Sequence, residues 1–231
     1  MKKGIIMALS LAAVVSACSA CAPQSKQDAP ASPNATNWND YMTKYRNDDN
    51  VDQLILVQYT GGSNADVLMY EKDRSQKNAW TLTVRTDGFV GLNGITEDKK
   101  EGDAKTPIGD FGVVDAFGIK PDPGTELTYT DITDTIYGCD EEGEYYNQII
   151  DTAKVRHDCK GEHMIEYSPQ YNYGMTIDYN KENKYPDGSA IFFHTKGAKS
   201  YTGGCIAVDE DVMVKILNTV KPGARVCINV K

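Results

Sequence analysis

Short strand-forming segments separated by turn residues recur along most of this chain, and they constrain its fold more than any other feature. Residues 53–60 (QLILVQYT) are mostly aliphatic, and a turn at 61–64 (GGSN) precedes a return segment at 65–71 (ADVLMYE), which predicts a β-hairpin. Residues 78–85 (NAWTLTVR) alternate and predict a third strand, which we expect Asp87-Gly88 to end. Further strands are predicted at residues 107–117, 164–167, 173–179, 190–195 and 224–230. This pattern predicts a mostly β architecture, a β-sandwich or an open barrel.

Three stretches depart from the strand pattern. Residues 209–220 (DEDVMVKILNTV) begin with acidic side chains and carry aliphatic residues at helical spacing, which predicts one C-terminal helix. Residues 38–50 space their Trp and Tyr residues at three and four, which indicates at most a short amphipathic helix. Residues 125–162 are acidic and polar, and we interpret them as an ordered polar insertion outside the core.

The N-terminus has the pattern of an export signal. Two lysines precede an apolar run around residues 5–15, which is shorter than the roughly 20 residues that span a bilayer. The run ends in Val-Ser-Ala before Cys18, which resembles the lipobox of bacterial lipoproteins and implies lipidation of Cys18; the alternative is an ordinary cleaved signal. We expect a signal peptide at 1–17, a lipid-anchored flexible linker at 18–36 and a folded domain at 37–231, on the outer face of a bacterial membrane.

Charge and location narrow the possible functions. The chain has 24 Lys+Arg and 33 Asp+Glu residues, so its formal net charge is -9. This balance argues against a nucleic-acid partner, because phosphate binding needs a basic face. An exported domain also has no supply of ATP or NAD. The acidic charge and the expected export together favour an enzyme that carries out hydrolysis or acyl transfer without a cofactor.

The segment IFFHTKGAKSYTGGCIAV combines residues that suit nucleophilic catalysis. A strand ends near His194, and Cys205 follows eleven residues later, after a pair of glycines. A thiol that attacks an amide needs a base to take its proton, and a histidine on a rigid strand can serve as that base. The glycines let the backbone turn so that amide N–H groups can face a developing oxyanion. The alternative is a structural cysteine after a Gly-Gly turn.

Two separated motifs carry a family resemblance. KTPIGDF at residues 105–111 and HTKGAKSYTGGCIAV at 194–208 together resemble the catalytic domain of the L,D-transpeptidases (YkuD type), over roughly residues 52–231. The resemblance implies a β-sandwich that needs no metal or cofactor, and it makes peptidoglycan stem peptides the substrate. It implies Cys205 as nucleophile and His194 as general base oriented by a backbone carbonyl. It also implies an oxyanion hole from the Gly204 and Cys205 amides, with Thr202 as the Ser/Thr of the cysteine box.

By the same resemblance, Cys205 attacks the amide before the terminal D-Ala of a tetrapeptide stem, and an amine of a neighbouring stem resolves the thioester into a 3→3 cross-link. Resolution by water would instead give an L,D-carboxypeptidase, and a surface lipoprotein that binds wall fragments without turnover is the second alternative. Two positions depart from the family pattern, because the chain has Gly203 where a His is frequent and Ala207 where Arg or Asn is common. We expect Lys196 or Lys199 to hold the substrate carboxylate in place of that Arg.

Two more cysteines border the acidic part of the insertion. Cys139 and Cys159 lie twenty residues apart in a chain that we expect to be exported, which suits a disulfide. Together with His157 and His163 they could also form a zinc site, but their spacing matches no standard structural zinc pattern. We therefore predict a disulfide and no metal.

Overall fold

A computed structural model describes residues 38–156 and 159–229. The signal peptide, Cys18 and the linker lie outside the described residues, as does His157, so the expectations for them stay predictions. Within the described part of the chain, no helix combines the length and apolar character needed to cross a membrane.

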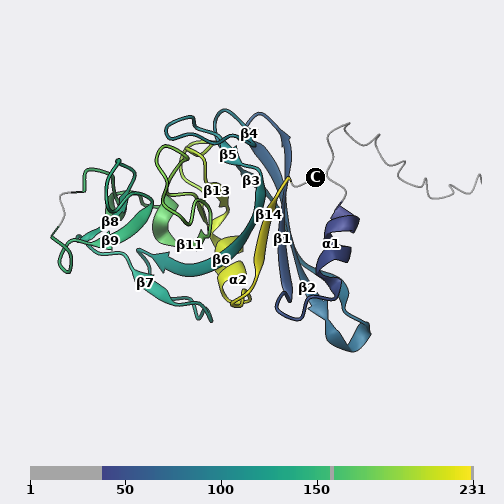
Figure 1. The fold of residues 1–231 in the computed structure, drawn as a ribbon. Coiled ribbons are helices and arrows are strands. Elements are labelled where there is room, and N and C mark those ends of the chain that lie inside the picture. Colours follow the sequence, from purple (N-terminus) through teal and green to yellow (C-terminus); the bar gives the residue numbers. More distant parts are fainter. Residues whose placement is uncertain (1–37, 157–158, 230–231) are drawn as a thin grey trace, which may run out of the picture. The chain divides into compact units, whose positions relative to one another are not determined.

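The main sheet closes on itself. Its nine strands, within the residues described, are β1 (Gln53–Gly61), β2 (Asn64–Asp73), β3 (Ala79–Phe89), β6 (Gly109–Gly118), β7 (Tyr129–Asp131), β11 (Gly174–Ile177), β12 (Phe192–Thr195), β13 (Ile206–Val208) and β14 (Arg225–Ile228). They follow the order β11-β12-β13-β3-β2-β1-β14-β6-β7, and β6 also pairs with β11 (Figure 1). The mostly β prediction is therefore confirmed, and the sheet forms a closed barrel with β7 outside the ring.

Strand β1 carries an unbroken apolar run at residues 54–57 because both of its faces are covered there. Ile55 and Val57 pack in the main core, together with residues of α2 (Glu210–Leu217). Leu54 and Leu56 face the opposite side, where α1 (Trp38–Arg46) covers them. A strand that alternated apolar and polar residues would leave one of these two faces without burial.

One predicted strand is longer in the structure, and another is a helix instead. β3 does not end at Asp87-Gly88 but continues to Phe89, which pairs with Ala207 of β13. Gly88 permits this pairing, because a Cβ there would lie 2.9 Å from the Ala207 carbonyl oxygen. The strand expected at residues 164–167 is instead the short 3-10 helix η2 (Met164–Glu166). Two further 3-10 helices are η1 (Arg74–Gln76) and η3 (Gln170–Asn172).

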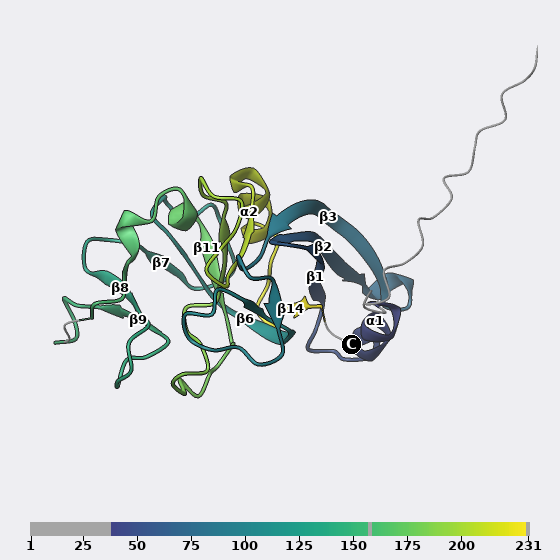
Figure 2. The ribbon, with the colours of Figure 1, turned by 90° about the horizontal axis from the view of Figure 1, so that it is seen from above.

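Only the later part of the polar insertion forms a sheet of its own. Its first part does not lie outside the core as expected, because β7 pairs with β6 of the main sheet and Leu127 packs in the main core. Strands β8 (Ile136–Cys139), β9 (Gln148–Asp151) and β10 (Glu162–His163) pair in the order β10-β8-β9. In both views β8 and β9 lie on the far side of the main sheet from α1 (Figures 1 and 2). A further pair, β4 (Ile95–Thr96) and β5 (Thr106–Pro107), runs parallel, and β5 lies in the KTPIGDF motif.

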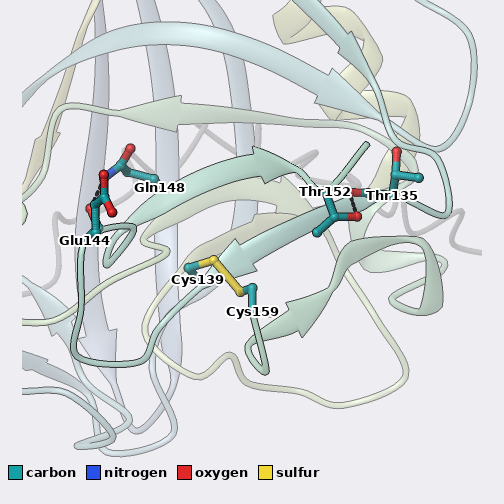
Figure 3. The surroundings of a disulfide bond; sticks show 6 residues. All are labelled: Thr135, Cys139, Glu144, Gln148, Thr152 and Cys159. Atoms are coloured by element: carbon teal, nitrogen blue, oxygen red, sulfur yellow. Dashed lines mark hydrogen bonds between the residues drawn. A yellow bond between two sulfur atoms is a disulfide. The ribbon is translucent and has the colours of Figure 1, made fainter. Parts of the chain in front are cut away.

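A disulfide joins Cys139 and Cys159 and closes a loop within the insertion, with the two Cα atoms 5.9 Å apart (Figure 3). The bond takes Cys139 and Cys159 out of the zinc set considered above. No group of three or more His, Cys, Asp or Glu residues within the described ranges is arranged to hold a metal ion. Closing a loop of this length stabilises a fold by about 3 kcal/mol in the chain-entropy account. The disulfide therefore helps to hold β8 and the segment before β10 in place.

Candidate active site

Parallel strand pairing brings His194 and Cys205 to one pocket. His194 lies in β12, opposite Ala207 of β13, and Cys205 directly precedes β13. Both side chains line a pocket of about 420 Å³. The sequence therefore folds its two predicted catalytic residues against the same cavity.

The imidazole of His194 is held in one tautomer. Its Nδ1 lies 2.7 Å from the backbone carbonyl oxygen of Thr195. A carbonyl oxygen only accepts hydrogen bonds, so Nδ1 carries the proton and Nε2 keeps a free lone pair. The ring of Tyr171 packs edge-on against the imidazole, with the centroids 5.5 Å apart. These two contacts fix the imidazole ring and leave Nε2 without a proton, as a base requires.

Both members of the pair are neutral at rest. Burial raises the pKa of the Cys205 thiol to about 12, and the nearby Glu162 carboxylate adds to this rise. Burial lowers the pKa of His194 to about 4, against the opposing effect of its hydrogen bond to Thr195. The thiol donates a hydrogen bond to the Ala190 carbonyl oxygen over 3.1 Å. Catalysis would therefore start from thiol and neutral imidazole rather than from a preformed ion pair.

Hydrogen bonds fix the loop that carries the nucleophile. The Thr202 hydroxyl donates to the Cys205 carbonyl oxygen (2.7 Å) and accepts from the Gly204 N–H (3.1 Å). Gly204 has φ +151°, and a Cβ there would lie 2.9 Å from the Lys105 carbonyl oxygen, so the position requires glycine. The Gly204 amide is thus engaged within the loop, whereas the Cys205 amide takes no part in these bonds. This geometry favours Cys205 over Gly204 as an oxyanion donor.

The two lysines expected to hold a carboxylate differ in position. Lys199 lines the pocket, and its Nζ lies 5.4 Å from the centroid of the Tyr201 ring. The Nζ of Lys196 instead bonds the carboxylates of Asp87 (2.6 Å) and Asp209 (3.2 Å), and Lys196 is not among the described residues that line the pocket. Lys199 is therefore the better placed of the two. Gly203 and Ala207 also line the pocket.

The sequence profile of the L,D-transpeptidase catalytic domain (YkuD) matches residues 52–228. The chain belongs to this family. Among solved structures, it is similar to the carbamoyl enzyme that Ldtfm forms with avibactam, with 15% identity and a TM-score of 0.37. It is also similar to a cysteine-to-serine mutant of an Enterococcus faecium L,D-transpeptidase, with 16% identity and a TM-score of 0.37. The similarities cover 78% and 77% of this chain and 49% of each of those chains, so this chain spans about half their length. No curated protein sequence matches it.

One wall of the pocket in this L,D-transpeptidase domain is acidic. Glu101, Asp140 and Glu162 all line it, and Glu162 accepts a hydrogen bond from the Tyr171 hydroxyl. Burial raises the pKa of Glu162 to about 7, and the charges of Asp140 and Glu101 add to the rise. Within the described residues, none of these three carboxylates forms an ion pair with Lys or Arg. We refer to the three residues as the carboxylate wall.

Sequence reasoning missed the carboxylate wall. Asp140 and Glu162 belong to the stretch interpreted as an insertion outside the core, but the pairing of β10 with β8 places them at the pocket. It also missed Lys99, a pocket-lining residue with a buried side chain, whose Nζ bonds the Asp103 carboxylate over 2.6 Å. No periodicity links these positions, so only the folded chain shows that they lie together.

Proposed function

We propose that this domain is a cysteine acyltransferase that acts on peptidoglycan stem peptides and forms 3→3 cross-links. The observation that carries the proposal is the shared pocket of Cys205 and His194, in a chain of the L,D-transpeptidase family. The fixed tautomer of His194 supports it, because Nε2 is available as a base.

The first half of the reaction forms a thioester. The Cys205 sulfur attacks the carbonyl carbon before the terminal D-Ala, and the thiol proton passes to Nε2 of His194. The Cys205 amide stabilises the oxyanion of the tetrahedral intermediate. The imidazolium then protonates the leaving nitrogen as the C–N bond breaks, and free D-Ala departs. The stem, shortened to a tripeptide, remains bound to sulfur as an acyl group.

The second half transfers that acyl group to an amine. The acceptor nitrogen attacks the thioester carbonyl and loses a proton, and the C–S bond breaks to regenerate the thiol. The carboxylate wall supports an amine acceptor, because carboxylates without cationic partners stabilise an ammonium group that binds beside them. The pKa of Glu162, raised by burial to about 7, also suits a group that takes a proton from this amine near neutral pH.

The exchange of Glu162 for glutamine tests this second half. The change removes the charge but keeps an acceptor for the Tyr171 hydroxyl. We expect the ratio of cross-linked dimer to hydrolysed tripeptide to fall about tenfold or more, since general-base catalysis contributes at least that much. The measurement is mass spectrometry of the products formed from a disaccharide-tetrapeptide that bears a side-chain amine.

Glu166→Gln is the matched control. The Glu166 carboxylate is exposed, contacts His163 and does not line the pocket, so the product ratio should stay at the wild-type value. An unchanged ratio in the Glu162→Gln variant would assign the wall another role. Release of D-Ala by the wild type with tripeptide and no cross-linked dimer as product would favour the L,D-carboxypeptidase alternative. Binding of glycopeptide without any D-Ala release would favour the non-catalytic wall-binding lipoprotein.

We also propose that the protein works on the outer face of a bacterial membrane, anchored by lipid on Cys18. The lipobox-like residues before Cys18 and the extracellular location of stem peptides support this. Cys18→Ala should move the protein from the membrane fraction to the soluble fraction and abolish incorporation of a labelled fatty acid. Retention of the label in this variant would contradict the assignment, and Cys21→Ala is the control.

A further inference from the structure

The hydroxyl of Thr106 bonds the backbone of the nucleophile from outside its loop. Thr106 lies in β5, is fully buried and precedes Cys205 by 99 residues. Its Oγ1 donates a hydrogen bond to the Cys205 carbonyl oxygen over 3.2 Å and accepts one from the Gly91 N–H over 2.8 Å. The chemistry proposed above gives this side chain no role.

The Cys205 carbonyl therefore accepts two hydroxyl hydrogen bonds, one from Thr106 and one from Thr202. A carbonyl oxygen has two lone pairs, so both are used, and the peptide plane between Cys205 and Ile206 is held in one orientation. The Thr202 hydroxyl belongs to the same loop as Cys205. Thr106 is on a different strand, so its bond ties the loop to the rest of the domain.

The backbone around Thr106 is itself fixed. The Thr106 N–H donates to the Gly94 carbonyl oxygen over 2.9 Å, and Gly91 forms a β-bridge with Thr202. Gly91 also packs tightly, because a Cβ there would lie 2.4 Å from the Ala104 carbonyl oxygen. The segments around residues 91, 106 and 202 are thus joined by hydrogen bonds into one unit next to Cys205. This unit holds the Thr106 hydroxyl in place.

We propose that Thr106 is a positioning residue for the Cys205 nucleophile: its hydroxyl fixes the peptide plane between Cys205 and Ile206, and with it the adjoining Cα that carries the thiol. The expected effect of Thr106 on the reaction rate rests on the proposed function. The effect of Thr106 on the position of Cys205 does not depend on that function. Small displacements of a reacting group, of about 1 Å, can slow a reaction by about 10²-fold.

Thr106→Val tests the proposal, because it keeps the shape of the side chain and removes the hydroxyl. We expect kcat for D-Ala release to fall by about 10- to 100-fold with KM changed little, and Thr106→Ser to restore most of the rate. Thr176→Val is the matched control. The Thr176 hydroxyl bridges the N–H (3.1 Å) and carbonyl (3.4 Å) of Asp115 and does not line the pocket, so this variant should keep the wild-type kcat.

A second measurement needs no substrate. The rate at which iodoacetamide alkylates Cys205, followed by peptide mapping, should fall at least about fivefold in Thr106→Val and recover in Thr106→Ser. This readout separates the two ideas: if the wild type releases no D-Ala, the proposed function fails while the alkylation rates still test the placement of Cys205. Thr106→Ser supplies the test if Thr106→Val does not fold, because near-wild-type kcat and alkylation in that variant support the hydroxyl role.

Two results would overturn the inference. One is a Thr106→Val variant with the kcat and alkylation rate of the wild type. The other is a Thr106→Ser variant as impaired as Thr106→Val, which would assign the effect to the methyl group and its packing rather than to the hydroxyl.

Discussion

Replacement of Cys205 by alanine should abolish release of D-Ala from a tetrapeptide stem. The Cys205 thiol is the nucleophile of the proposed reaction, so its removal takes away the group that carries the acyl intermediate. We expect kcat to fall by roughly 10⁴-fold or more, as it does when the nucleophile of a comparable catalytic unit is removed. The measurement is the initial rate of D-Ala release by the purified protein, with circular dichroism to confirm folding.

Cys227→Ala provides the control for this loss. Cys227 is a free, fully buried cysteine of β14 that lies in the cluster beneath α1 and does not line the pocket. Its replacement should change the thermal midpoint more than the rate of D-Ala release. Release that persists in Cys205→Ala at the wild-type rate would contradict the assignment of the nucleophile.

Replacement of His194 by glycine should give the second largest loss, about 10²- to 10⁴-fold in kcat, because the thiol then loses its proton acceptor. The glycine leaves a space in the pocket, so added imidazole should restore part of the rate. A variant that keeps the wild-type rate would show that another group takes the thiol proton.

The pH profile of the wild type gives a related expectation. Burial lowers the pKa of His194 to about 4, so the neutral base is fully present above about pH 5 and is lost as the pH falls through 4. The value of kcat/KM for D-Ala release should therefore not fall through protonation of His194 at pH 5 to 6, where an ordinary histidine is largely protonated. An acid limb near pH 6.5 that disappears in the His194→Gly variant would contradict this account.

Most strands could be predicted from the sequence because the faces that they bury determine local patterns of apolar and polar residues. β1 contains an unbroken apolar run at residues 54–57, since the main core and α1 cover its two faces there. β2 alternates buried and exposed residues at its start. Asp87-Gly88 misled the prediction, because Gly88 serves the close approach of β13 rather than a turn. Local patterns do not report on such contacts between distant segments.

The candidate site likewise has residues that the sequence indicates and contacts that only the fold shows. His194 and Cys205 could be picked out as candidates because the proposed roles depend on side-chain chemistry within one segment, and both line the pocket. The partner of His194 is a backbone carbonyl, which every residue has, so the sequence does not mark Thr195 for that role. The proposed roles of Glu162 and Thr106 depend on contacts with distant segments: Glu162 lies beside β8, and Thr106 bonds the Cys205 carbonyl. The sequence does not show these contacts, although Thr106 lies in the KTPIGDF motif.

Mass spectrometry of the intact protein, incubated with a disaccharide-tetrapeptide donor that lacks a side-chain amine, tests the central claim most directly. Without an acceptor amine the thioester should accumulate. We predict a mass gain equal to the donor minus D-Ala, mapped to the peptide that contains Cys205 and absent in Cys205→Ala. D-Ala release without an adduct in the wild type and undiminished in Cys205→Ala, or an adduct mapped to another residue, would contradict the account.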